Sequence, residues 1–308
     1  MKLLSRVSLA ALALGMLPFG AAQAAETAAP MKIGMTFQEL NNPYFVSMQE
    51  ALKQAAATIG AQVIVTDAAH DVSKQISDVE DMIHQGIKIL LVNPTDTDGI
   101  KNAVQEAHDA GIIVVAVDAN AAGPVDSFVG SKNRDAGYQS CKYLAKSIGG
   151  KGEVAILDGI PVVPIIERVE GCKAALAETP DVKIVTTQNG KQERDTALTV
   201  TENMIQAHPK LAGIFSVNDG GAMGVLAAIQ SSGKDIKLTS VDGAPEAVSE
   251  IAKGSKIFVE TTAQFPRDQV RIGLAMALAK SWGAKVVPKA VPIDVRVVDK
   301  DNASGFAW

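Results

Sequence analysis

Six polar residues stand where apolar, β-branched runs of the chain end. They are Asp67, Asn93, Asp118, Asn218, Asp242 and Gln264. Carboxylates accept hydrogen bonds and amides both donate and accept them, so this set can pair with the polar edges of a bound molecule. Asp and Asn also start turns and cap helices, and we favour that explanation for Asp67 and Asn93. The other four are candidate binding residues.

The segment that follows the first apolar run, Leu40–Phe45, reads LNNPYF. An amide and a turn proline followed by two adjacent aromatic rings can open a helix. Together they supply hydrogen bonds and an apolar surface to a ligand. Gln38 and Glu39, just before this segment, add polar and acidic groups. The segment therefore predicts a site for a ligand with polar edges and C–H faces.

Short apolar runs alternate with longer amphipathic stretches from Lys32 almost to the end of the chain. Strands are predicted at Lys32–Phe37, Gln62–Thr66, Lys88–Val92, Ile112–Val117, Glu153–Leu157, Lys183–Thr186, Ala212–Phe215, Lys237–Val241 and Lys256–Glu260. Helices are predicted at Tyr44–Ile59, Ser73–His84, Asp98–Ala110 and Asp195–His208. Repeated βαβ units of this kind indicate an α/β fold of doubly wound parallel sheets with helices on both faces.

The alternation breaks between Ala119 and Ser131, where a short strand, Ser127–Val129, replaces the expected helix and strand. We interpret this break as the first crossing between two domains, which agrees with the length of the chain. In doubly wound sheets, ligands bind outside the carboxyl ends of the strands, where the polar residues described above are expected.

Residues 1–24 have the pattern of a secretory signal peptide. A cationic start precedes an apolar run, Val7–Leu17, that is short for a membrane span, and Ala22-Gln23-Ala24 is a small-x-small cleavage pattern. An uncleaved membrane anchor is the alternative, but Pro18 ends the apolar run. We therefore expect export, with cleavage after Ala24.

Charge and composition argue against two other kinds of partner. Lys and Arg number 29 against 34 Asp and Glu, and no basic run could neutralise a row of phosphates, so nucleic acid is not expected. The four histidines lie far apart and outside any HxxxH or Cys/His pattern, so neither a metal site nor another cofactor is expected. We place His70, His84, His108 and His208 on helix surfaces.

Seven short motifs stand in order along the chain: LNNPYF at 40–45, NPTD at 93–96, VD at 117–118, RVEG at 168–171, FSVND at 215–219, VDG at 241–243 and TAQ at 262–264. Together they resemble the ribose-binding family of periplasmic sugar-binding proteins. Each motif is weak by itself, but together they cover nearly all of the chain after the signal peptide. The resemblance implies a type I periplasmic binding protein, in which two doubly wound lobes joined by three hinge crossings close over one sugar.

The resemblance also implies the lobe boundaries and the partners. The first lobe comprises 31–131 with 265–293, and the second 132–264 with 294–308. The tail Ala303–Trp308 is expected on the second lobe or near the hinge. We expect a periplasmic monomer that closes on a small sugar or polyol and delivers it to the membrane permease of an ABC transporter.

The ligand-binding residues follow from matching positions in the motifs. The resemblance implies hydrogen bonds to the ligand from Asn42, Asp118, Arg168, Asn218, Asp242 and Gln264, and packing by Tyr44 and Phe45. Gln38 and Gln192 are further candidates. Sugar hydroxyls donate and accept at once, so carboxylates, amides and a guanidinium all suit them. Arg168 has an alternative role, a surface ion pair with Glu167 or Glu170.

Two departures from the family pattern bear on the ligand. The family's ribose binders have an arginine directly after the aspartate matched to Asp118, where this chain has Ala119, and Gln192 stands near the place of a pocket aromatic. Ribose itself is therefore not favoured, and a monosaccharide, polyol or amino sugar is expected. Two aspartates and one arginine leave one negative charge in excess, which argues against sugar acids and phosphates. Glu39 directed into the pocket would favour an amino sugar.

The two cysteines, Cys141 and Cys172, lie on predicted helices at Ala136–Ser147 and Arg168–Glu178. An exported protein can keep a disulfide. Two helices on one face of a sheet could bring the cysteines within the required distance. We therefore expect a Cys141–Cys172 bridge.

Three other functions stand as alternatives. A secreted Rossmann-type enzyme would need a GxGxxG turn after a strand or a GxSxG nucleophile motif, and the spacing within Gly220–Gly224 is wrong, so we expect no enzyme. A DNA-binding repressor of similar fold would carry a helix-turn-helix where the signal peptide stands. A receptor that presents its sugar to a membrane signalling protein fits the sequence as well as a transport protein does.

Overall fold

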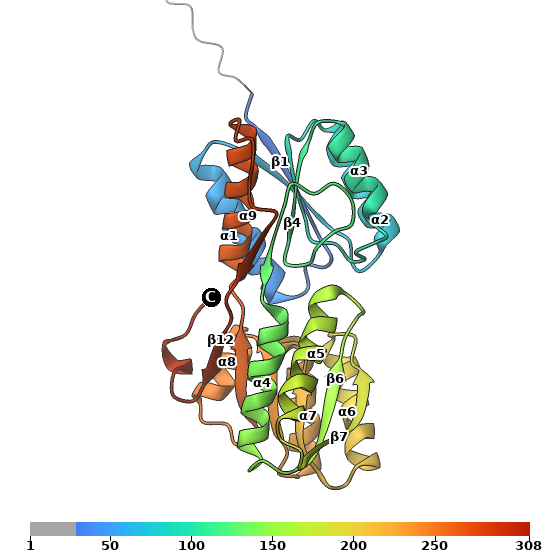
Figure 1. The fold of residues 1–308 in the computed structure, drawn as a ribbon, viewed down its shortest axis with the longest axis vertical. Helices are drawn as coiled ribbons and strands as arrows, with labels where there is room; N and C mark the ends of the chain where they lie inside the picture. The colour runs from blue at the N-terminus through green and yellow to red at the C-terminus, as the bar shows by residue number, and fades with distance from the viewer. Residues whose placement is uncertain (1–28) are drawn as a thin grey trace, which may run out of the picture.

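The computed structural model describes residues 29–308, which form two α/β lobes along the long axis of the molecule (Figure 1). The predicted signal peptide, residues 1–24, lies outside the described residues. Each lobe is built on a six-stranded sheet. Within residues 29–308, no helix is both long enough and apolar enough to span a membrane.

The sheet of the first lobe is parallel throughout, with strand order β11-β5-β4-β3-β1-β2. Its strands are β1 (Lys32–Phe37), β2 (Gln62–Asp67), β3 (Ile89–Val92), β4 (Ile113–Val117), β5 (Ser127–Ser131) and β11 (Ala290–Ile293). One face is covered by α1 (Pro43–Thr58) and α9 (Pro266–Ser281), the other by α2 (Val72–His84) and α3 (Lys101–Asp109). Because both faces are buried, the central strands read as almost continuous apolar runs.

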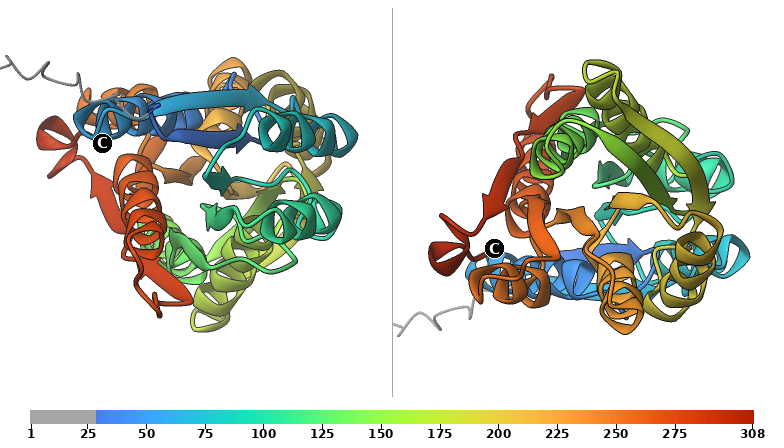
Figure 2. Two further views of the ribbon diagram at one scale, coloured as in Figure 1. Left: turned by 90° about the horizontal axis from the view of Figure 1, so that it is seen from above. Right: turned by 90° about the horizontal axis from the view of Figure 1, so that it is seen from below.

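The second sheet has the order β12-β10-β9-β8-β6-β7, and only its edge strand β12 is antiparallel among the described residues. Its strands are β6 (Gly152–Asp158), β7 (Val182–Asn189), β8 (Leu211–Ser216), β9 (Lys237–Asp242), β10 (Phe258–Ala263) and β12 (Arg296–Asp299). One face carries α4 (Asn133–Ser147) and α5 (Val163–Ala177), the other α6 (Arg194–Ala207), α7 (Asp219–Ser232) and α8 (Pro245–Ala252). Figure 2 shows the helices around both sheets from the two ends of the molecule.

The chain passes between the lobes at three connections. They are the segments from β5 to α4, from β10 to α9 and from β11 to β12. Each connection is only a few residues long, so the two sheets are held end to end. That the two lobes divide into domains at the predicted boundaries stays a prediction.

The sequence pattern predicted an α/β fold of doubly wound sheets, and the structure confirms it. Helix α5 begins at Val163, before its predicted start at Arg168. Pro164 permits this start, because in the first turn of a helix the missing N–H of a proline breaks no helical hydrogen bond. The strand predicted at Lys256–Glu260 is shifted to the range of β10. Here the hydroxyl of Ser255 accepts hydrogen bonds from two following backbone N–H groups and holds the start of the segment in a turn.

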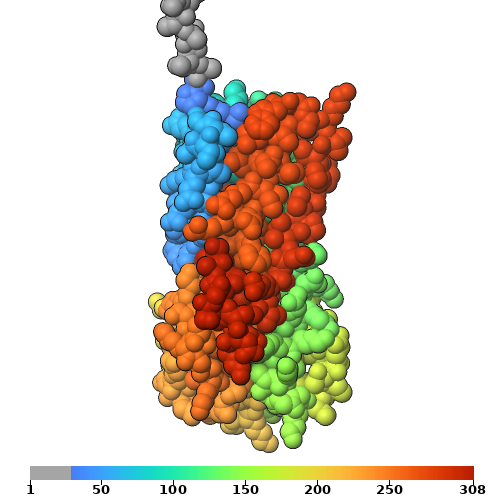
Figure 3. Space-filling model, turned by 90° about the vertical axis from the view of Figure 1, so that its left-hand side faces the viewer, coloured from blue at the N-terminus to red at the C-terminus, as the bar shows by residue number. Residues whose placement is uncertain are grey.

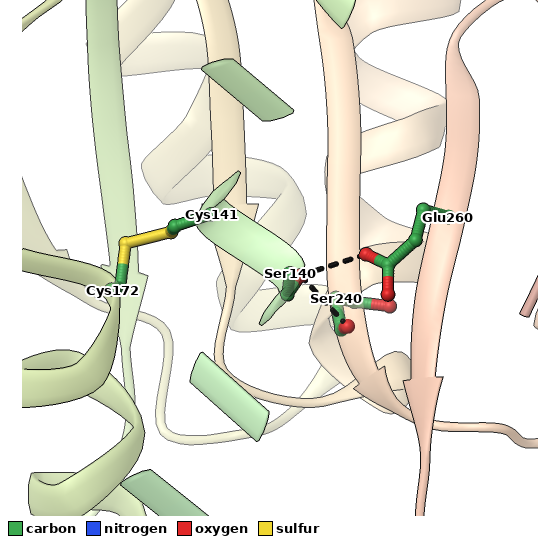
Figure 4. Close-up of a disulfide and its surroundings, with 5 residues drawn as sticks. All are labelled: Ser140, Cys141, Cys172, Ser240 and Glu260. Atoms are coloured by element: carbon green, nitrogen blue, oxygen red, sulfur yellow. Dashed lines mark hydrogen bonds between the residues drawn. A yellow bond between two sulfur atoms is a disulfide. The ribbon is translucent and has the colours of Figure 1, made fainter. Parts of the chain in front are cut away.

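Helices α4 and α5 approach each other unusually closely. A Cβ atom at Gly137 would lie 1.8 Å from the backbone oxygen of Arg168, and one at Gly171 would lie 1.9 Å from that of Arg134. The predicted disulfide is present between these helices, with Cα atoms of Cys141 and Cys172 4.9 Å apart (Figure 4). The close contact fixes the turn of α5 that carries Arg168.

Candidate ligand-binding site

The structure brings all ten sequence-predicted site residues to one cavity between the lobes. They are Gln38, Asn42, Tyr44, Phe45 and Asp118 on one side and Arg168, Gln192, Asn218, Asp242 and Gln264 on the other. The cavity lies at the carboxyl ends of strands, the usual position in doubly wound folds. Its free volume is about 20 Å³, far below the roughly 300–1,000 Å³ of ligand pockets. Side chains of the two lobes therefore nearly fill this cavity.

An aromatic cluster forms the first-lobe wall. The Asn42 side chain caps α1 by accepting a hydrogen bond from the backbone N–H of Tyr44 (3.0 Å), which places the rings at the helix start. The rings of Tyr44 and Phe45 pack edge to face with centroids 5.2 Å apart. The Tyr44 hydroxyl donates to Oδ1 of Asp118 (3.0 Å) and accepts from Nε2 of Gln269 (2.9 Å). Tyr44 is thus held by polar contacts as well as by packing.

Asp118 follows β4 in a left-handed backbone conformation, with φ 68°. Non-glycine residues rarely adopt this conformation, so tertiary contacts must hold it. Its Oδ2 accepts a hydrogen bond from Nδ2 of Asn93 (3.2 Å). Burial raises the pKa of the Asp118 carboxyl to about 6, although the positive charge of Arg168 opposes the shift. Asp118 is therefore ionised at pH 7 but takes up a proton in mild acid.

The two residues assigned to turns differ in the structure. Asp67 accepts a hydrogen bond from the backbone N–H of Ala69 (2.8 Å), as expected for a turn residue. Asn93 is fully buried, and besides bonding Asp118 its Oδ1 accepts from the backbone N–H of Gln38 (3.2 Å). The turn explanation for Asn93 is therefore wrong, because its amide supports two pocket residues.

Arg168 is the cation of the second-lobe wall and is 4% exposed. Its Nε donates to Oδ1 of Asn133 (2.9 Å), and its Nη1 donates to the backbone oxygen of Val217 (2.8 Å). The same Nη1 lies 3.3 Å from Oδ1 of Asp242, forming a buried ion pair. Partners on α4, on β9 and in the loop after β8 fix the plane of the guanidinium.

The alternative role for Arg168, a surface ion pair with Glu167 or Glu170, is wrong. Glu170 pairs instead with Arg134 of α4, with Oε2 and Nη1 2.8 Å apart, and both of these side chains are exposed. The neighbouring helix thus supplies the surface partner, and Arg168 faces the interior.

Asp242, at the end of β9, is the second carboxylate in the cavity wall. Its Oδ1 accepts a hydrogen bond from Nε2 of Gln264 (2.7 Å) as well as from Arg168. Its Oδ2 accepts from the backbone N–H of Asp219 (3.3 Å). Burial raises the pKa of Asp242, and the Arg168 charge acts against that shift. Like Asp118, Asp242 has a positive φ, here 137°.

Sequence reasoning missed Asp219, a buried carboxylate directly behind Asp242. Oδ1 of Asp219 accepts hydrogen bonds from the hydroxyls of Ser240 and Thr261, and Oδ2 accepts from the backbone N–H of Ala244 (2.6 Å). These bonds fix the turn after β9. Burial raises the pKa of Asp219 to about 7, and the Asp242 charge adds to the shift. Acidic residues commonly begin helices, so its position at the start of α7 was not distinctive, although Asp219 is the last residue of the FSVND motif.

Two amide side chains of the second lobe, Asn218 and Gln192, line the cavity and also form hydrogen bonds with the protein backbone. Asn218 caps α7 by accepting from the backbone N–H of Gly221 (3.1 Å), and its Nδ2 donates to the backbone oxygen of Gln192 (3.2 Å). Oε1 of Gln192 accepts from the backbone N–H of Ile160 (3.3 Å). Sequence reasoning missed the apolar part of this wall, since such residues look like ordinary core: Val162, Pro164 and Ile165.

Glu39 and His70 pair with each other beside the cavity and do not line it. Oε2 of Glu39 lies 3.1 Å from Nε2 of His70, and Nδ2 of Asn42 donates to Oε1 (3.4 Å). The hydrogen bond with Glu39 raises the pKa of His70. The predicted helix-surface position of His70 is wrong, because this residue lies in the loop between β2 and α2 with φ 62°.

The sequence and the fold are similar to those of known periplasmic binding proteins. A family model described as the periplasmic binding protein domain matches residues 33–285. The ribose import binding protein of Bacillus subtilis is 40% identical over 235 residues, 76% of each chain. The solved structure of an ABC transporter periplasmic solute binding protein from Actinobacillus succinogenes with bound D-allose has a TM-score of 0.85 and 32% identity, covering 90% of this chain and 100% of that one. A Caulobacter myo-inositol binding protein bound to myo-inositol has a TM-score of 0.83 and 32% identity, covering 90% and 97%.

Proposed function

Because the chain belongs to the periplasmic binding protein family, we propose that it is the solute-binding component of an ABC uptake system and holds a neutral monosaccharide or polyol between its lobes. In this proposal the domains are 31–131 with 265–293 and 132–264 with 294–308. Cleavage after Ala24 leaves a periplasmic monomer, and the partner is the permease of the transporter.

One observation carries the proposal: polar groups from both lobes converge on one cavity and are already held in place by the protein. Arg168 uses Nε and Nη1 for protein partners, which leaves Nη2 to donate to a ligand. The carboxylates of Asp118 and Asp242 supply acceptors from opposite lobes. Such preorganisation reduces the entropy that binding would otherwise cost. Hydroxyl groups suit this arrangement because each can donate to a carboxylate and accept from the guanidinium.

The charge balance favours a ligand without a negative charge. Asp219 adds a third buried carboxyl group to Asp118 and Asp242, against the single cation Arg168. An anionic ligand would bring further negative charge into this site, at a high cost in desolvation. Glu39 is paired with His70 outside the cavity wall, which removes the reason to favour an amino sugar. We therefore propose a neutral sugar or polyol.

Lobe closure provides the mechanism. Because side chains of both lobes nearly fill the cavity in this structure, a sugar can enter only after the lobes separate. A ligand bound to one open lobe gains the contacts of the other lobe only on closure, so it shifts the population toward the closed form. The permease then distinguishes the closed, loaded protein from the open one by its shape.

A binding panel tests the proposal. It contains D-ribose, D-allose, other hexoses, xylitol, hexitols, myo-inositol, galactosamine, glucosamine and aldonates, measured by calorimetry. We expect a neutral compound to bind with micromolar or tighter affinity, to raise the free energy of unfolding by about 2.7 kcal/mol at 100 times its Kd, and to reduce the radius of gyration in small-angle scattering. Tight binding of an aldonate alone would contradict the charge argument, and an unchanged radius with a tight ligand would contradict closure.

A further inference from the structure

The C-terminal tail links the two lobes outside the three chain crossings. The short 3-10 helix η1 (Ala303–Gly305) lies against α8, and Ala303 and Phe306 pack into the core of the second lobe. Two residues later, Trp308 packs against the core of the first lobe. Figure 3 shows the dark red C-terminal end of the chain over the junction of the lobes. The tail therefore begins on one lobe and ends on the other.

Trp308 contacts two of the proposed ligand-binding residues, one on each side of the cavity. Its ring packs edge to face on Tyr44, with centroids 5.7 Å apart and ring planes at 84°. Its indole Nε1 donates a hydrogen bond to the backbone oxygen of Asp242 (2.9 Å). The two contacts use different parts of the indole, so both form at once.

The contacted residues need outside support. Asp242 has a φ of 137°, a conformation that a non-glycine residue keeps only when its surroundings hold it. The bond from Trp308 to its carbonyl is one such support. The Tyr44 hydroxyl must be aimed at Asp118, and packing of the indole against the Tyr44 ring limits its rotation.

We propose that Trp308 is a positioning residue that orients Tyr44 and Asp242 and ties the closed lobes together. The inference rests on the proposed function. Since Tyr44 lies on the first lobe and Asp242 on the second, separation of the lobes breaks at least one contact of the indole. The contacts of Trp308 therefore raise the population of the closed form, and with it the affinity for ligand.

The chain contains only one other tryptophan, which provides a matched control. Trp282, at the end of α9, is 72% exposed. Calorimetry with the compound that binds wild type most tightly in the panel should show about tenfold weaker binding for Trp308→Ala, which loses an aromatic pair and a hydrogen bond. Trp308→Phe keeps a ring for Tyr44 and should recover part of the loss. Trp282→Phe should stay within twofold of wild type.

The outcome that overturns the inference is a Trp308→Ala protein that binds within twofold of wild type. Equal binding by the Phe and Ala variants would also overturn it, because a retained ring would then contribute nothing. Circular dichroism and thermal unfolding of each variant separate this effect from loss of the fold.

Failure of the proposed function is distinguished from failure of this inference, because in that case the wild-type protein binds no compound of the panel. The ligand-free protein then decides the role of Trp308, through hydrogen exchange of the two indole N–H groups followed by NMR. The signals are assigned with Trp282→Phe. A hydrogen-bonded Trp308 should exchange at least tenfold more slowly than the exposed Trp282, and equal exchange rates would overturn the inference.

Discussion

Asp118 in the first lobe and Asp242 in the second are similarly buried carboxylates, 6% and 5% exposed, that face the same cavity. Their partners differ. Asp118 accepts hydrogen bonds from two neutral groups, the Tyr44 hydroxyl and the Asn93 amide. Asp242 accepts from the Arg168 guanidinium and has a second carboxyl group behind it. Neutral groups donate hydrogen bonds to the first-lobe acid, whereas a cation and neutral groups together donate to the second-lobe acid.

The comparison shows how each wall keeps an acceptor available for a ligand. Neutral hydrogen bonds offset only part of the cost of burying a charge, so the first-lobe acid takes up a proton in mild acid. The positive charge of Arg168 opposes the rise in the pKa of Asp242 that burial causes, and each partner of the buried ion pair then depends on the other for stability. We therefore expect the first-lobe wall to be sensitive to pH and the second-lobe wall to be sensitive to loss of its cation.

The largest effect is expected from Arg168→Ala. The substitution removes a ligand donor and leaves Asp242 without its cation, so ligand binding should weaken at least tenfold. The free energy of unfolding should fall by about 3 kcal/mol, as when one partner of a buried pair is lost. Calorimetry and urea unfolding at pH 7 measure the two effects. The double variant Arg168→Ala with Asp242→Asn should regain stability without regaining binding.

Arg134→Ala provides the matched control on the adjacent helix. Arg134 forms an exposed ion pair with Glu170, so its loss should change stability by no more than about 1 kcal/mol. Ligand affinity should stay within twofold of wild type. If Arg134→Ala and Arg168→Ala had equal effects, the assignment of Arg168 to the pocket would be wrong.

The next effect concerns pH and the first-lobe wall. The pKa of Asp118 is about 6 in the folded protein, so at pH 5 only about a tenth of it is ionised. A ligand hydroxyl that donates to this carboxylate loses its acceptor on protonation. Affinity measured by calorimetry should therefore fall up to about tenfold between pH 7 and pH 5.

Asp118→Asn separates this effect from the titration of other groups. The amide cannot ionise, so the variant should bind about tenfold more weakly at pH 7 and should lose the pH dependence of affinity. If Asp118→Asn kept the wild-type pH profile of affinity, the pH dependence would come from another group. Asp219, with a pKa of about 7, would be the group to examine. Such a result would break the contrast between the two walls.

Much of the fold could be predicted because strands and helices of this kind carry local signals. Buried parallel strands read as short apolar runs, and the polar residue after each run marks the carboxyl end of the sheet. Element boundaries were less predictable. The predicted start of α5 was wrong, since the helix already begins at Val163 and a proline is compatible with its first turn.

The parts of the site that could not be predicted depend on contacts between distant residues. Asp219 has the local features of an ordinary helix start, and its hydrogen bond to Thr261 joins residues 42 apart in the sequence. Asn93 resembles a turn residue until Asp118, 25 residues later, is placed beside it. Trp308 lies in a tail whose path over both lobes no local pattern reveals. Sequence motifs predicted the polar and aromatic residues of the cavity wall, but neither its aliphatic residues nor the residues that hold the wall in place.

The smallest effect on ligand binding is expected at Glu260 of β10, a further fully buried acid that does not line the cavity (Figure 4). Its oxygens lie 2.8 Å from the Ser140 hydroxyl and 2.6 Å from that of Thr262. Ser140 also lies within hydrogen-bond distance of the Ser240 carbonyl (3.1 Å). A serine has a single proton to donate, so if the carbonyl takes it, the proton toward Ser140 comes from Glu260. Burial raises the pKa of Glu260 to about 8, in agreement with a neutral acid.

A carboxyl group with a raised pKa stabilises the fold most at low pH. The folded protein keeps the Glu260 proton up to about pH 8, whereas the unfolded chain loses it near the ordinary value of 4.5. The folded state therefore binds more protons between these values, and the free energy of unfolding falls by up to about 1.4 kcal/mol per pH unit as the pH rises.

Glu260→Gln, whose amide donates a hydrogen bond as the neutral acid does, should flatten this slope and should be at least as stable as wild type at pH 8. Urea unfolding between pH 5 and pH 8 measures it, with the exposed Glu106→Gln as a control that keeps the wild-type slope. An unchanged slope in Glu260→Gln would mean that burial does not raise the pKa of Glu260. The same explanation for the raised pKa of Asp118 would then be wrong.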